Sequence, residues 1–404
     1  MSKVRLTEIT GGVTAPRGYR ASGVRCGIRR ERKDLALLFS EVPASAAGVF
    51  TTNRVAAAPV LVTRGKVRGG RLQAVVVNAG NANACTGRRG LEDAMAMAEL
   101  AARELGIDSS LVAVASTGVI GVPLPMARLE EGIPMAVREL SPDGGPRAAE
   151  AIMTTDTVAK EAAVELELAG CTVRVGGMAK GSGMIHPNLA TMLGFVTTDA
   201  PVTPECLDRM LRDAVDRSFN AITVDGDTST NDMVLALANG MAGVPTISGP
   251  GPEYDALQGA LEAISFSLAQ QIVRDGEGAT KFVEVVVKGA RSREDARRAA
   301  KAVANSSLVK TALFGQDANW GRIICAVGYS GAEVEPDSID LFLGPLQVVQ
   351  GGAGIPFDEG QARDILGGRE IRIEVHLGLG EYEAVVWTCD LSYDYVRING
   401  SYRS

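Results

Sequence analysis

A run of small and polar residues in mid-chain could carry covalent chemistry. The segment Lys180-Gly-Ser-Gly-Met-Ile-His186-Pro-Asn-Leu-Ala190-Thr191 places a glycine-rich turn before an alanine and a threonine. If the chain cuts itself between Ala190 and Thr191, Thr191 becomes an N-terminus with a hydroxyl nucleophile and its own amine as base. An α-amino group has a pKa of about 8 before perturbation, so it can accept a proton near neutral pH. The run therefore predicts an acyl-transfer enzyme.

A structural interpretation of the same residues stays open at this point. A threonine among apolar residues is more often a β-branched strand residue than a nucleophile. Gly181, Ser182 and Gly183 permit a strained turn, and such strain would help the hydroxyl attack the preceding carbonyl. His186, which precedes a proline, is interpreted as structural rather than as a base.

Composition limits the classes of function. The 404 residues are 46% hydrophobic and carry a net charge of -7, which argues against a nucleic-acid partner. No apolar run approaches the roughly 18 residues that cross a bilayer, and the first residues lack a signal-peptide core. We therefore expect a cytoplasmic protein with no membrane partner. The two histidines are 190 positions apart, so no histidine-rich metal site is expected, and the six scattered cysteines are expected to be buried thiols.

The periodicity of the chain predicts a mixed α/β protein. Apolar residues at helical spacing predict helices over 91–105, from Pro204 after the N-cap Thr203, and over 255–275, where Gly276 ends the helix. Residues 78–83 are predicted as a turn after a buried strand. The other expected elements are a helix over 292–304 and strands over 73–77, 282–288, 371–376 and 383–389. Their alternation favours sheets covered by helices.

Six blocks of this sequence, in order, resemble the ArgJ family, the glutamate N-acetyltransferases or ornithine acetyltransferases. One glycine-rich match would be weak, but the six together span nearly the whole chain. They are Thr52-Asn53, Asn78 to Gly87, Ser116 to Gly121, Lys180 to Leu193, Asp225 to Asp232 and Asp317 to Arg322.

The resemblance implies a fold and a division of the chain. The fold would be the α/β (α+β sandwich type), self-cleaving, N-terminal-nucleophile-like DmpA/ArgJ fold, with mixed sheets covered by helices and a C-terminal subdomain. Self-cleavage at Ala190–Thr191 would leave an alpha fragment, residues 1–190, and a beta fragment, residues 191–404. Within the beta fragment, about 191–280 would complete the catalytic core. About 281–404 would form the C-terminal subdomain, whose tail returns to the site.

The resemblance also implies roles for individual residues. Thr191 would be the nucleophile, and Thr117 with Gly118 would form an oxyanion hole from a hydroxyl and a backbone N–H. Lys180 could pair with the α-carboxylate that ornithine and glutamate share, and Glu277 could orient the Thr191 amine or bind a cationic amine. The substrate-binding positions would be Thr154, Lys180, Thr191, Glu277, Asn399 and Ser404.

The implied reaction moves an acetyl group from N2-acetylornithine to L-glutamate through an acetyl-threonine, in arginine biosynthesis. The implied assembly holds two alpha and two beta fragments, with no metal and no cofactor. Whether acetyl-CoA also donates acetyl groups stays open. Two alternatives also stay open: an amidohydrolase or aminopeptidase on the same self-cleaving fold, and an unprocessed protein that binds a small molecule. The aspartates between Asp225 and Asp232 lack the spacing of a calcium loop and favour a hydrogen-bonding loop.

Overall fold

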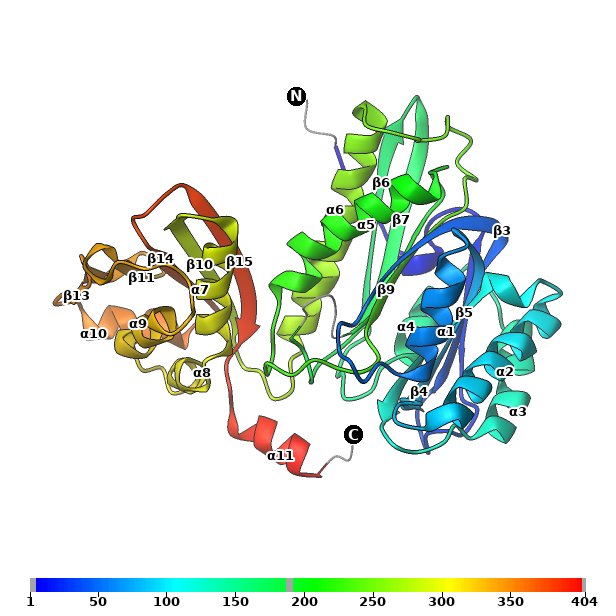
Figure 1. Cartoon of the computed structure of the whole chain (residues 1–404), viewed down its shortest axis with the longest axis horizontal. Coiled ribbons are helices and arrows are strands. Elements are labelled where there is room, and N and C mark those ends of the chain that lie inside the picture. The colour runs from blue at the N-terminus through cyan, green and yellow to red at the C-terminus, as the bar shows by residue number, and fades with distance from the viewer. Residues whose placement is uncertain (1–4, 187–191, 402–404) are drawn as a thin grey trace. The chain divides into compact units, whose positions relative to one another are not determined.

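The structure is a computed structural model that describes residues 5–186 and 192–401 (Figure 1). The chain divides into two compact units. The first comprises the described residues up to Asn220 together with Asp227–Ile272, and the second comprises Ala221–Gly226 together with the described residues from Val273 onward. Each unit contains its own sheet.

The first unit is built on a nine-stranded mixed sheet. Its spatial order is β1-β6-β7-β8-β9-β3-β4-β5, and β2 pairs with β3 in addition. The pairs β4–β5 and β8–β9 are parallel, and the others are antiparallel. The strands are β1 (Thr7–Glu8), β2 (Tyr19–Val24), β3 (Leu35–Phe50), β4 (Arg71–Asn81), β5 (Val112–Val119), β6 (Lys160–Leu168), β7 (Cys171–Lys180), β8 (Leu193–Thr198) and β9 (Met233–Ala238).

Four strands meet at one end of this sheet. The register pairs Lys180 with Leu193, Leu193 with Met233, and Met233 with Phe50. The end of β7, the start of β8, the start of β9 and the end of β3 therefore lie in one row. The predicted nucleophile is two positions before Leu193 in the sequence, so this row is the framework on which a site can be built.

The helices that pack on the sheet of the first unit are α1 (Ala58–Val67), α2 (Gly87–Leu105), α3 (Met126–Arg138), α4 (Gly145–Ala151), α5 (Pro204–Arg217) and α6 (Pro252–Arg274). The predicted helices are confirmed. Thr203 caps α5, and its side chain accepts a hydrogen bond from the Cys206 N–H. The predicted apolar face of α6 is buried, and its side chains Ile264 and Leu268 pack close to Gly177 of β7. Figure 1 shows α5 and α6 lying along the strands β7 and β9 of this sheet.

The second unit holds a six-stranded sheet in the order β13-β12-β11-β14-β10-β15. Its core is formed by alternate residues of β10, β14 and β11 together with the small residues of α7, such as Ala296, Ala299 and Ala300. The strands are β10 (Phe282–Ala290), β11 (Asp340–Leu343), β12 (Leu346–Gln350), β13 (Ala353–Gly354), β14 (Glu370–His376) and β15 (Tyr382–Cys389). The helices are α7 (Arg293–Asn305), α8 (Ser307–Phe314), α9 (Trp320–Gly328), α10 (Glu359–Gly367) and α11 (Tyr393–Ser401).

Mixed sheets covered by helices confirm the predicted fold class, but two local predictions were wrong. Residues 78–81 continue β4 instead of forming a turn, because their polar side chains find buried partners. Only three cysteines are buried; Cys85, Cys171 and Cys325 are exposed. No helix in the described part of the chain is long and apolar enough to cross a membrane.

Candidate active site

A buried charged cluster lies at the end of β7. The side chains of Lys160 and Asp156 are both fully buried, and Lys160 Nζ lies 2.7 Å from Asp156 Oδ1. The same carboxylate oxygen accepts a 2.7 Å hydrogen bond from the Gly181 N–H, directly after Lys180. Lys180 itself is only 8% exposed. One carboxylate therefore joins the start of β6 to the end of β7.

The electrostatics of this cluster keep Asp156 ionised. Burial alone would raise the pKa of the Asp156 carboxyl, because a charged group loses solvation. The charges of Lys180 and Lys160, and the hydrogen bonds from Lys160 and from the Thr154 N–H, outweigh burial and hold the pKa of Asp156 well below its usual range. The three side chains together carry one net positive charge, which favours an anionic ligand.

The cluster also positions Thr154. The Thr154 N–H donates to Asp156 Oδ2 at 2.9 Å, and the half-buried threonine side chain lies close to the same oxygen. On its other side, the Thr154 carbonyl accepts from Arg29 Nη2 at 3.3 Å, and the Met153 carbonyl accepts from Arg29 Nη1 at 2.7 Å. The Asp156 carboxylate therefore holds the backbone of Thr154 and the backbone directly after Lys180, and both of these residues are predicted to bind substrate.

The predicted oxyanion hole lies on β5, at the edge of the same sheet, with β8, β9, β3 and β4 between it and β7. Gly118, in β5, has a φ of +131°, and a Cβ there would lie 2.4 Å from the carbonyl carbon of its strand partner Gly80. Only glycine fits this position. The Thr117 side chain is 9% exposed, and its hydroxyl has no hydrogen-bond partner in the described part of the chain. A nearly buried hydroxyl that is free to donate suits the stabilisation of an oxyanion.

Buried asparagines hold this strand in place. Ser116 Oγ donates to Asn78 Oδ1 at 2.6 Å, and Asn231 Nδ2 donates to the Ser116 carbonyl at 2.9 Å and to the Ala82 carbonyl at 2.6 Å. Asn231 belongs to the predicted loop of aspartates, where Thr228 Oγ1 also donates to the His186 carbonyl. The loop therefore forms hydrogen bonds, as predicted. The described residues contain no cluster of three or more His, Cys, Asp or Glu that could hold a metal.

Arg29 connects the two parts of the site. Its Cγ would lie 2.8 Å from a Cβ built on Gly80, so the arginine packs directly against the strand partner of Gly118. Its guanidinium reaches the carbonyls of residues 153 and 154, as described above. The order Gly118, Gly80, Arg29, Thr154 is therefore one continuous contact path within the first unit.

The second unit brings together two other predicted residues. Asn399 Nδ2, in α11, donates to Glu277 Oε2 at 2.7 Å. Glu277 is 8% exposed, so it is not the solvated loop charge that its glycine neighbours would suggest. Ala190, Thr191 and Ser404 lie outside the described residues. The turn before them ends with Met184 at a φ of +55° and with a bridge between Ile185 and Thr228.

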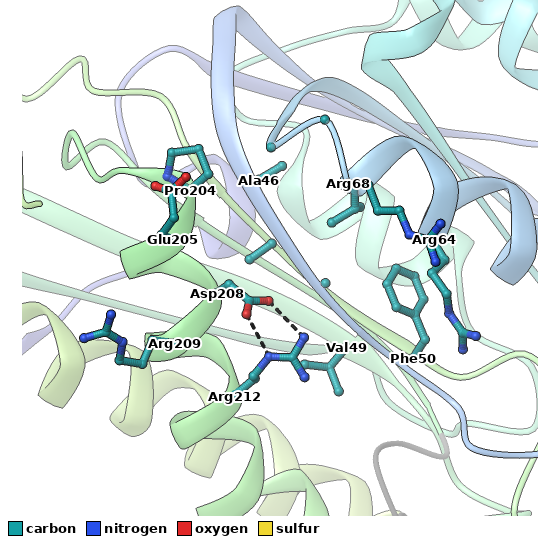
Figure 2. Close-up of a pocket in the computed structure, with 15 residues that line it drawn as sticks. Ala46, Val49, Phe50, Arg64, Arg68, Pro204, Glu205, Asp208, Arg209 and Arg212 are labelled. Atoms are coloured by element: carbon teal, nitrogen blue, oxygen red, sulfur yellow. Dashed lines mark hydrogen bonds and ion pairs between the residues drawn. The ribbon is translucent and has the colours of Figure 1, made fainter.

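A separate groove in the first unit lies between α1 and α5, over the Ala46–Phe50 part of β3 (Figure 2). Its volume is about 880 Å³, and it is lined by four arginines and two carboxylates. In Figure 2, Asp208 and Arg212 of α5 are joined by two contacts, at 2.8 and 3.2 Å. None of the described site residues that the sequence predicts lines this groove.

The sequence prediction missed three residues: Arg29, Asp156 and Lys160. The signal for two of them was present, because Asp156 and Lys160 are four positions apart in a short polar segment before a strand. No pattern marked Arg29, whose position depends on contacts with residues more than 120 positions away.

The fold is that of an α/β protein. Its site carries a net positive charge and is held together by the Asp156 carboxylate, and Arg29 links it to β5, the strand that requires glycine at position 118. The sequence profile of the ArgJ family matches residues 20–404. The arginine biosynthesis bifunctional protein ArgJ of Symbiobacterium thermophilum is 59% identical over 399 residues, which cover 98% of this chain and 99% of that protein. This chain belongs to the ArgJ family.

Solved structures of the family are also similar to parts of the chain. A chain of arginine biosynthesis bifunctional protein ArgJ from Bacillus halodurans is 47% identical, with a TM-score of 0.51. It is covered completely and matches 52% of this chain. A chain of ornithine acetyltransferase from Mycobacterium tuberculosis, crystallised with ornithine, is 47% identical, with a TM-score of 0.44, and is covered completely by 46% of this chain.

Proposed function

We propose that this protein transfers the acetyl group of N2-acetylornithine to L-glutamate through an acetyl-threonine. Family membership makes it an acetyltransferase of arginine biosynthesis. The observation that carries the finer proposal is the Asp156–Lys160–Lys180 cluster, a buried site with one net positive charge. Both substrates carry an α-carboxylate, so one cationic site can hold each of them in turn.

In the first half-reaction, the Thr191 oxygen attacks the acetyl carbonyl of N2-acetylornithine, and the Thr191 amine accepts the hydroxyl proton. The tetrahedral oxyanion accepts hydrogen bonds from the Thr117 hydroxyl and the Gly118 N–H. The amide C–N bond then breaks, and the amine of ornithine leaves with the proton. The acetyl group remains as an ester on Thr191.

In the second half-reaction, the amine of glutamate attacks this ester. The ester C–O bond breaks, Thr191 recovers its proton, and N-acetylglutamate leaves. Lys180 holds the α-carboxylate in both halves, and Thr154 lies beside it on the same Asp156 carboxylate. In the second unit, Glu277 accepts a hydrogen bond from Asn399, which orients its carboxylate for a cationic amine.

The nucleophile requires a self-cleaved chain, so we propose an alpha fragment, 1–190, and a beta fragment, 191–404, with two copies of each in the assembly. In the cleavage step the Thr191 oxygen attacks the Ala190 carbonyl carbon, the Ala190–Thr191 C–N bond breaks as the Thr191 nitrogen takes the hydroxyl proton, and water then hydrolyses the resulting ester to a free carboxylate and the Thr191 hydroxyl. A beta fragment would hold 214 of the 404 residues, close to the share of this chain that the whole Bacillus halodurans chain covers. Mass spectrometry of the purified protein tests this, and a chain that stays intact on prolonged incubation contradicts it.

The hydrolase alternative is not favoured, because the chain belongs to the ArgJ family. The experiment that tests the transferase is incubation of the protein with N2-acetylornithine, with and without glutamate. We expect N-acetylglutamate and ornithine in equal amounts when glutamate is present, and little acetate when it is absent. Equal acetate release in both incubations, without N-acetylglutamate, would contradict the proposal.

A Thr191→Ala variant tests the nucleophile directly. Loss of the hydroxyl removes both the cleavage and the acetyl ester, so we expect a single intact chain without transferase activity. A Thr191→Ser variant keeps a hydroxyl and is expected to keep part of both. A cleaved and active Thr191→Ala protein would overturn the assignment. An assay with acetyl-CoA and glutamate as the only substrates decides whether a second acetyl donor is used.

A further inference from the structure

We propose that Arg29 is a positioning residue, which sets the spacing between the oxyanion hole and the substrate-binding segment at Thr154. Asp34 holds Arg29 in place. The role of both residues is to fix other groups rather than to contact the reacting atoms. The inference rests on the proposed function, because it concerns the alignment of the same substrates for the same acetyl transfer.

Asp34 closes the loop between β2 and β3 that carries Arg29. Its carboxylate is fully buried and accepts three backbone hydrogen bonds: Oδ1 accepts from the Cys26 N–H at 2.7 Å, and Oδ2 accepts from the Gly27 N–H at 3.1 Å and from the Arg29 N–H at 2.7 Å. Hydrogen bonds from backbone N–H groups to a carboxylate are among the stronger ones in proteins. The Asp34 carbonyl also accepts from the Ala79 N–H at 2.9 Å. One residue therefore ties the backbone of Arg29 to β4.

The stem of Arg29 packs against the strand that borders the proposed oxyanion hole. Gly80 has a φ of +104°, and a Cβ there would lie 2.8 Å from Arg29 Cγ and 3.0 Å from Ile28 Cγ2. Gly80 is the partner of Gly118 in the β4–β5 pair. A larger residue at position 80 would push Arg29 away, so the arginine stem and this part of β4 have to move together.

The guanidinium of Arg29 reaches the other half of the site. Nη1 donates to the Met153 carbonyl at 2.7 Å, and Nη2 donates to the Thr154 carbonyl at 3.3 Å. Because a guanidinium is planar with donors at fixed spacing, one group holds two successive carbonyls, which a lysine ammonium on a flexible stem does not do. Arg29 has other interactions as well, and these two bonds are the ones that tie it to the Thr154 segment.

The acetyl transfer uses both ends of this connection at once. The acetyl carbonyl has to lie at the Gly118 N–H while the amino-acid part of the same molecule lies at Thr154. A displacement of about 1 Å between two such groups can cost about 100-fold in rate. Since both substrates use the same two positions, loss of the connection should slow both half-reactions and change the binding of the amino-acid part much less.

The test is a single-turnover measurement on the cleaved protein, with N2-acetylornithine and no glutamate. Mass spectrometry of the beta fragment gives the rate at which acetyl-threonine forms and the fraction of chains that finally carry it. We expect the rate to fall about tenfold in Arg29→Lys and about 100-fold in Arg29→Met, with the final fraction of the unsubstituted protein. The KM for glutamate should change little. A role in folding alone would give the opposite result, a smaller fraction at an unchanged rate.

Asp34→Asn tests the same connection from its other end. The amide places an NH2 group where one oxygen was, so at least one of the three N–H donors loses its acceptor. We expect the acetylation rate to fall about tenfold. Because Asp34 acts through Arg29, the double variant Asp34→Asn/Arg29→Met should be no slower than Arg29→Met, whereas independent effects would multiply. If Arg29→Met fails to fold or to cleave, Arg29→Lys takes its place in this comparison.

The matched control is Lys66→Met. Lys66 Nζ also donates to two backbone carbonyls of a distant segment, those of Ser109 and Val112, at 2.7 and 2.8 Å, and its loss should leave the acetylation rate unchanged. Arg29 variants with the rate of the unsubstituted protein would overturn the inference, and so would single effects that multiply in the double variant. If the unsubstituted protein forms no acetyl-threonine, the proposed function itself has failed, which this measurement keeps separate.

Discussion

Two ion pairs in the first unit have nearly the same length but different surroundings. Lys160 Nζ lies 2.7 Å from Asp156 Oδ1, and both side chains are fully buried. Arg212 Nε lies 2.8 Å from Asp208 Oδ2, with side-chain exposures of 57% and 43%. The first pair has lost its water, whereas the second can exchange its protein contacts for water contacts at little cost. The N–O distance alone therefore does not tell how much each ion pair contributes to stability.

The partners of the two pairs differ as well. Asp156 also binds the backbone of two segments that carry predicted site residues. Asp208 and Arg212 are four positions apart on α5, and among the described residues their side chains form hydrogen bonds only with each other. Removal of one buried partner leaves an uncompensated charge in the protein, while removal of one exposed partner leaves a solvated side chain.

The largest expected effect is that of Lys160→Met. It leaves the Asp156 carboxylate buried without the cation of its 2.7 Å ion pair, which typically costs about 3–5 kcal/mol of folding free energy. We expect the melting temperature to fall by several degrees, measured by calorimetry on the cleaved protein. The double variant with Asp156→Asn should recover a large part of this loss. An unchanged melting temperature in Lys160→Met would show that burial does not distinguish the two pairs.

A second substitution separates stability from chemistry, because it leaves both ion pairs intact. Gly118→Ala would place a Cβ 2.4 Å from the Gly80 carbonyl carbon and force the strand to move. Loss of one oxyanion donor typically costs about 100-fold or more in kcat, and we expect a decrease of that size. The matched control is Gly121→Ala, because Gly121 also has a positive φ but a Cβ at this position would have no heavy atom within 4 Å. Equal kcat values for the two variants would contradict the proposed role of Gly118.

The effect of acid on stability sharpens the comparison further. The pKa of Asp156 is lower in the folded protein than its unfolded value of about 3.9. Its contribution to stability is therefore fully present above about pH 4 and is lost as pH falls through the folded pKa. In Lys160→Met that pKa should rise, so melting temperatures recorded between pH 3 and 7 should begin to fall at a higher pH than in the unsubstituted protein. Parallel curves would show that Lys160 does not set the pKa.

Local patterns predicted the helices well, and the reason is physical. The apolar side chains of α5 and α6 repeat at helical spacing, and the Thr203 cap is encoded within three residues of the helix start. The strand at Asn78 was mistaken for a turn, because asparagine is unfavourable in a strand unless its side chain finds a partner. Those partners are Ser116 and the Asn81 carbonyl, and the first lies 38 residues away.

The site was only partly predictable for the same reason. Resemblance to a family supplied Thr117, Gly118 and Lys180 through their motifs, and it implied Thr154 as a substrate-binding position outside the six blocks. Asp156 looks like part of a polar turn in the sequence, and its burial arises only when β6 and β7 pair and bring residue 181 to it. The prediction that Glu277 and Asn399 both bind substrate stays a prediction; within the second unit their side chains are hydrogen bonded to each other.

The smallest expected effect is that of Arg212→Ala in the exposed pair. An i, i+4 pair on a helix surface contributes about 0.3–0.5 kcal/mol, and exposed pairs in general contribute less than about 1 kcal/mol. We expect a change in melting temperature near the limit of measurement and no change in KM or kcat, since no described site residue contacts this groove. A double-mutant cycle with Asp208→Ala should give a coupling that disappears at 1 M salt, because a Debye length of about 3 Å screens exposed charges. A coupling above about 2 kcal/mol that persists in salt would place the groove pair with the buried one, and would mean that distance rather than burial decides the strength of both.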